Sequence, residues 1–253
     1  MNLRRCRRAL ALAWALTLCM LRLMGVRLRG PLTPPRRAMW LQSACRGVVD
    51  SLGIHCVVNG TVPSRGLVVS NHLSYLDIAI YSAAMPCVFV AKAEVRRWPY
   101  FGFAARVSGS VFLDRTSRAG AALAAAEIAN RLRTDVPVLL FPEGTSTDGA
   151  QVLRFHSSLF QPAVLAGSPV TAAAIRYVVR GSATEQDLCW FGDEAFFSHL
   201  WRALGAPRFS AEIVFGPPAV YGDRRIAAST TQERVVEMRA TQSILAESTA
   251  TRD

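Results

Sequence analysis

Residues 68–77 constrain the chain most, because an apolar strand pattern passes directly into a polar turn that carries a histidine and a carboxylate. A histidine can take a proton from a hydroxyl when a neighbouring carboxylate fixes its tautomer and stabilises its charged form. His72 and Asp77 are five residues apart, and side chains at this spacing diverge by about 140° on a regular helix. The two meet if His72 lies on the turn before a helix and Asp77 lies in its first turn. An ordinary helix cap followed by a surface aspartate is the alternative interpretation.

Two further apolar runs end in polar residues. Residues 139–141 lead into Pro-Glu-Gly and a cluster of hydroxyl side chains at 145–147, and residues 109–113 lead to Asp114 and Arg115. In an α/β sheet, strand ends that face the same way place their loops around a common crevice. We therefore expect one site, built from the loops that follow these three strands.

The motifs together resemble the lysophospholipid acyltransferase family, the enzymes related to 1-acylglycerol-3-phosphate O-acyltransferase. One such motif would be weak evidence, whereas four in the same order and spacing form a specific match. The match extends over about residues 65–180. The four segments, in order, are Asn71-His72 to Asp77, Phe112 to Arg115, Phe141 to Thr145, and Ser168-Pro169-Val170 to Ile175.

The resemblance implies acyl transfer by direct attack, in which Asp77 holds His72 and His72 takes the proton from the acceptor hydroxyl. The donor would be acyl-CoA or acyl carrier protein, with no cofactor and no metal ion. Two cations, Lys92 and Arg115, would contact the anionic head group of the acceptor, and Glu143 would orient its hydroxyl. The substrate-binding residues implied are Lys92, Arg115, Glu143, Gly144 and Thr145.

The implied acceptor is 1-acyl-sn-glycerol-3-phosphate, which would give phosphatidic acid. The family often has an arginine after Glu-Gly-Thr, whereas this chain has Ser146, so a cation is missing from the expected phosphate pocket. Acylation of lyso-ornithine lipid, or of another lysolipid, is therefore an alternative. From a different class, the chain could be a catalytically inactive, membrane lipid-binding adaptor.

The N-terminal segment is basic and apolar. It holds ten arginines and no acidic residue before Asp50, although the whole chain carries a net charge of +11. Residues 9–21 are uncharged, and a full membrane span needs about 20 apolar residues, so we expect a helix that lies in or dips into one leaflet. A proline-rich turn at 31–35 and a second helix at 38–52 complete a predicted hairpin. A cleaved signal peptide, and a second helix that packs in the core, are the alternatives.

The arginines flank apolar sequence, which favours an anionic membrane surface over nucleic acid as a partner. We expect the protein at the cytoplasmic face of the inner (cell) membrane. The six cysteines include no Cys-x-x-Cys pair, so the sequence indicates neither a zinc site nor a disulfide framework.

From residue 54 onwards, strand patterns alternate with helix patterns. This predicts an α/β fold with a mixed, largely parallel sheet flanked by helices. Residues 1–53 would form the membrane-docking hairpin and residues 54–253 the acyltransferase domain. An aromatic cluster at 189–201 would line an acyl path or pack in the core. The predicted strands are 54–58, 67–69, 87–91, 110–113, 136–141, 170–179 and 213–215, and the predicted helices are 75–84, 97–107, 118–133, 155–166 and 231–247.

Overall fold

A computed structural model describes residues 3–114, 116–179 and 183–250, with side chains described as far as residue 242. Within these residues, seven strands form one sheet in the order β1-β7-β6-β2-β5-β3-β4. Neighbouring strands are parallel except β6 and β7, so the predicted mixed, largely parallel sheet is confirmed. The strands are β1 (Ile54–Asn59), β2 (Leu67–Ser70), β3 (Val88–Lys92), β4 (Val111–Leu113), β5 (Val138–Leu140), β6 (Val170–Val179) and β7 (Phe209–Ala219).

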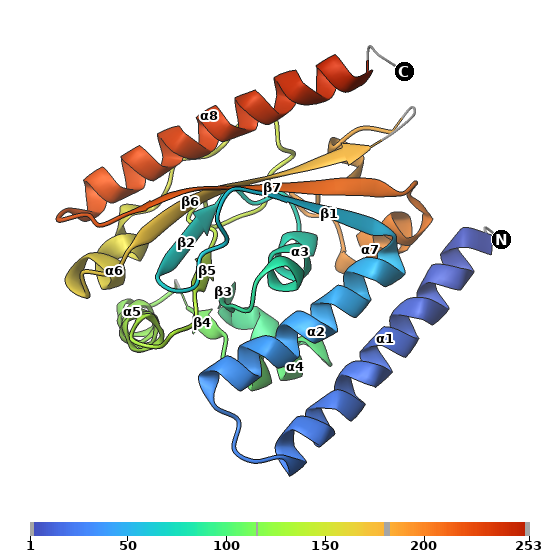
Figure 1. The fold of residues 1–253 in the computed structure, drawn as a ribbon, viewed down its shortest axis with the longest axis horizontal. Helices are drawn as coiled ribbons and strands as arrows, with labels where there is room; N and C mark the ends of the chain where they lie inside the picture. Colours follow the sequence, from blue (N-terminus) through green and yellow to red (C-terminus); the bar gives the residue numbers. More distant parts are fainter. Residues whose placement is uncertain (1–2, 115, 180–182, 251–253) are drawn as a thin grey trace.

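Helices cover both faces of the sheet (Figure 1). On one side lie α1 (Leu3–Leu28), α2 (Pro34–Leu52), α3 (Leu76–Ala84), α4 (Phe101–Ser108) and α7 (Phe196–Gly205). On the other side lie α5 (Arg118–Leu132), α6 (Gln161–Leu165) and α8 (Arg224–Ala250). Three short 3-10 turns, η1 (Ala93–Arg97), η2 (Ser157–Phe160) and η3 (Gln186–Leu188), complete the described elements.

The centre of the sheet is apolar on both faces. Every residue of β2 is buried: Val68 packs towards α3, whereas Leu67 and Val69 pack towards α5 and α8. Strands covered by helices on both sides are continuous apolar runs rather than alternating ones. This is why β2 and β5 are easy to find in the sequence.

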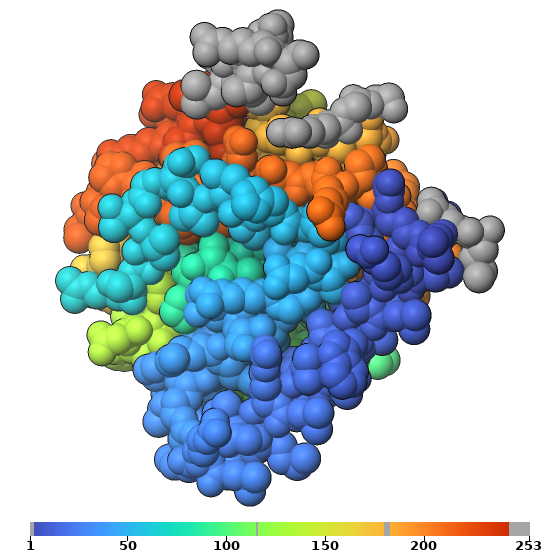
Figure 2. Space-filling model, turned by 45° about the vertical axis from the view of Figure 1, so that its right-hand side comes forward, coloured from blue at the N-terminus to red at the C-terminus, as the bar shows by residue number. Residues whose placement is uncertain are grey.

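The N-terminal helices form the predicted hairpin, and α2 lies between α1 and α3 (Figure 1). Trp40 of α2 is 3% exposed, and its indole N–H donates to the Cys19 carbonyl of α1 at 3.0 Å. Side chains of both helices belong to the same hydrophobic core as α3 and the sheet. On the surface, α1 and α2 form one continuous blue region (Figure 2). A division into domains at residue 53 stays a prediction, because the hairpin and the sheet share this core.

Several elements differ from the sequence predictions. The helix expected at 155–166 is the turn η2 followed by the short helix α6, and the helix expected at 97–107 begins only at Phe101. The strand expected at 213–215 extends over Phe209–Ala219, because Ser210 and Glu212 alternate with buried Phe209, Ala211 and Ile213. The aromatic cluster after residue 195 contains a helix, α7, that the pattern did not predict. The last helix begins at Arg224 rather than at 231. Asp223 caps this start, because its side chain accepts hydrogen bonds from the N–H groups of residues 225 and 226.

Candidate active site

The turn between β2 and α3 is tied to the neighbouring strand β6. The Asn71 amide donates to the Ile175 carbonyl at 3.0 Å, and its oxygen accepts the Ile175 N–H at 2.9 Å. These two bonds satisfy the backbone of β6 at the point where β2 has ended. The turn is therefore fixed to the sheet immediately before His72.

His72 and Asp77 meet in the way that the five-residue spacing required. His72 lies on the turn, Asp77 lies in the first turn of α3, and the His72 Nδ1 is 2.8 Å from Asp77 Oδ2. The His72 ring also stacks on Phe141, the residue after β5, with centroids 4.1 Å apart. Because Nδ1 faces the carboxylate, Nε2 is the ring nitrogen left to face a substrate.

Asp77 has no exposed surface and accepts hydrogen bonds from four groups of the described chain. Its Oδ2 takes the His72 ring N–H and the backbone N–H groups of Leu73 and Ser74, at 2.7 and 3.1 Å. Its Oδ1 accepts from the hydroxyl of Tyr177 on β6. A buried carboxylate is tolerated when donors replace its lost hydration. The charged form of Asp77 is thus held in one orientation, directed at the imidazole.

Glu143, after β5, supports the same turn from the other side. It is 4% exposed; one oxygen accepts the His72 N–H at 2.8 Å and the other accepts the Leu153 N–H at 2.7 Å. Burial raises the pKa of Glu143 to about 7, although these two donors act to lower it. The carboxyl group therefore joins the turn that carries His72 to the loop that follows β5.

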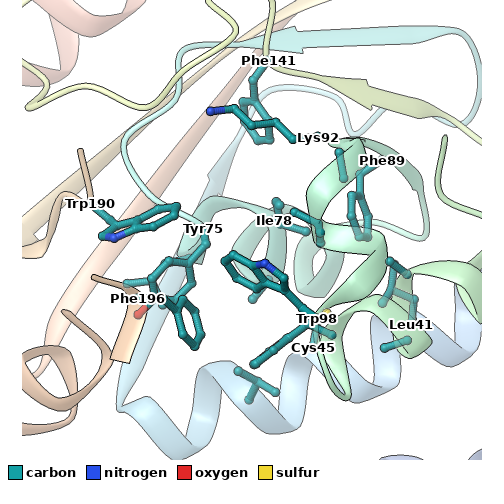
Figure 3. Close-up of a pocket in the computed structure, with 18 of the residues that line it drawn as sticks. Leu41, Cys45, Tyr75, Ile78, Phe89, Lys92, Trp98, Phe141, Trp190 and Phe196 are labelled. Atoms are coloured by element: carbon teal, nitrogen blue, oxygen red, sulfur yellow. The ribbon is translucent and has the colours of Figure 1, made fainter. Parts of the chain in front are cut away.

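His72 opens onto a cavity of about 510 Å³ that extends beneath the hairpin. Its wall includes Phe141 and Lys92, an aromatic group of Tyr75, Trp98, Trp190 and Phe196, and Leu41 and Cys45 of α2 (Figure 3). Most of these side chains are apolar, so the cavity suits a hydrocarbon chain. Among the described residues, no three His, Cys, Asp or Glu side chains are grouped as metal ligands.

Comparison with known proteins identifies the family. A model of the acyltransferase family matches residues 54–176. The chain is 37% identical over 188 residues to the lyso-ornithine lipid O-acyltransferase of Rhodobacter capsulatus, which covers 71% of this chain and 67% of that protein. It is 33% identical over 174 residues to the 1-acyl-sn-glycerol-3-phosphate acyltransferase of Neisseria meningitidis, which covers 67% of this chain and 68% of that one. This chain belongs to the lysophospholipid acyltransferase family.

The fold of this acyltransferase also matches a solved structure. The crystal structure of the 1-acyl-sn-glycerophosphate acyltransferase PlsC from Thermotoga maritima superposes with a TM-score of 0.61. The match covers 95% of this chain and 98% of that one, at 20% sequence identity. At this identity the likeness shows the fold alone.

The acyltransferase brings three of its predicted substrate-binding residues to the cavity. Lys92, at the end of β3, and Gly144 and Thr145, after β5, line the cavity together with His72. Glu143 lies behind them, with both oxygens directed at backbone N–H groups, so its contact with an acceptor stays a prediction. Arg115 lies outside the described residues. The catalytic and substrate-binding roles remain predictions.

The loop of residues 188–190 covers the turn that carries His72 in this acyltransferase. The Trp190 N–H donates to the Leu73 carbonyl at 2.9 Å, and the hydroxyl of Ser146 donates to the Trp190 carbonyl. On α7, His199 is fully buried and its Nδ1 is 2.9 Å from the Tyr75 hydroxyl. The sequence provided no local signal for these contacts, because each joins residues that are 44 or more positions apart.

Glu143→Gln is expected to destabilise this acyltransferase most at low pH. The pKa of Glu143 is higher in the folded chain, about 7, than its ordinary value of 4.5, so the folded chain binds more protons between these values. The contribution of this group to stability is present below pH 4.5 and is lost as pH rises through 7. A glutamine keeps the shape, but its amide N–H₂ faces a backbone N–H and one hydrogen bond is lost.

The measurement is the thermal midpoint of wild type and Glu143→Gln at intervals from pH 5 to pH 8. The wild type should exceed the variant at pH 5, and the difference should shrink by pH 8. Glu127→Gln, at a half-exposed glutamate on α5, is the control and should show no such trend. A difference that grows with pH would contradict the assignment.

Proposed function

We propose that the protein transfers a fatty acyl group from an acyl thioester to the free hydroxyl of a lysolipid. The observation that carries the proposal is an imidazole held by a buried carboxylate at the opening of an apolar cavity. His72 is 17% exposed in its side chain, so a substrate can reach its ring. The relatives in the family, which act on lyso-ornithine lipid or on 1-acyl-sn-glycerol-3-phosphate by name, support the same reaction class.

The reaction needs no protein nucleophile. His72 Nε2 takes the proton of the acceptor hydroxyl while the oxygen attacks the carbonyl carbon of the thioester. Asp77 stabilises the imidazolium that forms. When the tetrahedral intermediate collapses, the carbon–sulfur bond breaks and the leaving thiolate takes the proton from His72. The products are the ester and the free thiol of coenzyme A or of the acyl carrier protein.

The backbone of the catalytic turn is not the source of oxyanion stabilisation. The N–H groups of His72, Leu73 and Ser74 already donate to Glu143 and Asp77. Donors for the developing oxyanion must come from another segment of the cavity wall. Gly144, Thr145 and Ser146 also line the cavity, and we propose that this segment supplies such a donor.

Lyso-ornithine lipid is the acceptor that we favour, with 1-acyl-sn-glycerol-3-phosphate as the competitor. An ornithine head group carries a carboxylate and an ammonium, whereas the glycerol lipid carries a phosphate. Lys92 and the exposed Glu94 line the same cavity, so charges of both signs are available there. Ser146 stands where the family often has arginine, and its hydroxyl donates to a backbone carbonyl. Relatives named for lyso-ornithine lipid, at 37% and 35% identity, add support.

The hairpin would hold the enzyme at the cytoplasmic face of the membrane. By length and composition α1 could cross a bilayer, and a signal sequence passes the same test. Large apolar side chains are exposed along α1, including Leu10, Trp14 and Leu21, which are 73%, 63% and 53% exposed. Arginines such as Arg22, Arg27 and Arg29 accompany them and can extend to lipid phosphates.

His72→Ala should abolish acyl transfer while leaving the protein bound to liposomes. General base catalysis contributes about 10²- to 10⁴-fold, so a loss of at least about 100-fold in kcat is expected. The assay follows transfer of a labelled acyl chain from acyl-CoA or acyl carrier protein to lyso-ornithine lipid. His156→Ala, at an exposed histidine, is the control and should retain activity. Turnover that survives His72→Ala would contradict the mechanism, and wild-type protein that binds liposomes without turnover would favour the adaptor.

The kcat/KM for lyso-ornithine lipid should exceed that for 1-acyl-sn-glycerol-3-phosphate about tenfold. A competition assay that contains both lipids measures this ratio. Glu94→Gln should lower the use of lyso-ornithine lipid, because the ammonium loses its counter-charge, and should leave the use of 1-acyl-sn-glycerol-3-phosphate unchanged or higher. A preference of wild type for the phosphate lipid would overturn this choice of acceptor and restore phosphatidic acid as the product.

Replacing Leu10, Trp14 and Leu21 together by glutamine should release the protein from membranes. Each large apolar side chain contributes about 1.5–3 kcal/mol when it is fully buried, so co-flotation with phosphatidylglycerol-containing liposomes should fall at least about tenfold. The control replaces Leu123, Leu165 and Ile226, which are large apolar side chains of similar exposure outside the hairpin, by glutamine. Equal flotation of both triple variants would count against the hairpin as the docking element.

A further inference from the structure

Tyr177 contacts the catalytic pair from behind. It lies on β6, its side chain is 1% exposed, and its hydroxyl donates to Asp77 Oδ1, the oxygen that does not face His72. The two oxygens of Asp77 thus have separate partners: Oδ2 holds the imidazole and the turn, and Oδ1 holds the tyrosine. Burial, with the charge of Asp77, holds the pKa of Tyr177 well above its usual range, so the phenol stays a donor.

A partly buried ion pair fixes the strand segment that carries Tyr177. The Tyr177 N–H donates to Glu185 Oε1 at 2.8 Å, and Glu185 pairs with Arg239 of α8 through both carboxylate oxygens, at 2.8 and 2.9 Å. Arg239 also donates to the carbonyls of Ile175, at 3.0 Å, and Gly149, at 2.6 Å. The Tyr177 backbone is therefore held by Glu185, which Arg239 of α8 fixes in turn, and this leaves the hydroxyl little freedom to move away from Asp77.

We propose that Tyr177 is a positioning residue that sets the basicity of His72 through Asp77. The proposal rests on the proposed function. A donor on Oδ1 draws negative charge away from Oδ2, so the carboxylate stabilises less strongly the imidazolium that forms when His72 takes a proton. The same bond holds the carboxylate in the rotamer that directs Oδ2 at the ring. Tyr177 thereby controls both the direction and the strength of the contact between Asp77 and His72.

Tyr177→Phe removes the donor and keeps the ring. The pKa of His72 should rise by about half a unit to one unit, and the acid limb of the pH profile of kcat/KM should move to higher pH by the same amount. At neutral pH kcat should fall about 1.5- to threefold, which is the loss of unprotonated imidazole that such a shift causes. KM should change less than about twofold, because the change acts on the base and not on substrate binding.

The matched control is Tyr81→Phe. Tyr81 is also fully buried, and its hydroxyl bonds to Ser70 Oγ at 2.7 Å and not to Asp77. The Tyr81→Phe variant should show the same His72 titration, and the same acid limb in the pH profile of kcat/KM, as the wild type. If both variants move them equally, the effect comes from loss of a buried hydroxyl in general, and the proposal fails.

The His72 titration is read by NMR of protein with labelled histidine, in detergent and without substrate. His72→Ala assigns the signal among the four histidines of the chain. Because this readout does not need turnover, it tests Tyr177 even if the proposed function is wrong. A lower thermal midpoint with an unchanged His72 titration would show a merely structural role and overturn the proposal.

A second variant covers the case in which Tyr177→Phe does not fold. A fluorinated tyrosine at position 177 keeps the hydroxyl and makes it a stronger donor, so the pKa of His72 should fall instead of rise. A rise, or no change, in this folded variant would overturn the proposal on its own.

Discussion

The geometry of the site depends on the fully buried carboxylate of Asp77. Taking a carboxylate out of water costs several kcal/mol unless donors replace the water, and here the donors come from the catalytic turn and from β6. Those donors coincide when β6 lies next to β2 and α3 follows β2 directly. The site therefore requires this strand order. If another strand lay beside β2, Asp77 would lose the hydrogen bond from Tyr177 of β6.

The second constraint is that the hairpin and the active site share one core. Leu12 and Cys19 of α1, and Trp40 and Leu41 of α2, line the same cavity as His72. On the proposed function, the acyl chain lies between the helices that dock on the membrane and the sheet that carries the base. An apolar chain could then reach the reacting oxygen without crossing water, which agrees with the low polarity of the cavity wall.

Local patterns predicted the parts of the site that neighbouring residues build. The strand-to-helix transition at residues 68–77 predicted the contact between His72 and Asp77, and the apolar runs predicted β2, β5 and β6. Helix α7 was missed although its apolar side chains do follow a helical period, because the segment was interpreted from its aromatic content alone. Partners across the fold were equally hidden: Tyr177 is 100 residues from Asp77, and a tyrosine in a buried strand looks like packing until the sheet order is known.

The tautomer of His72 tests the central claim most directly. The account requires that the neutral ring carries its proton on Nδ1, facing Asp77, and leaves Nε2 as the base. Nitrogen-15 NMR of the labelled ring, above the pH at which it titrates, separates the two forms. The account predicts a protonated Nδ1 and an unprotonated Nε2, and a ring protonated on Nε2 would contradict it.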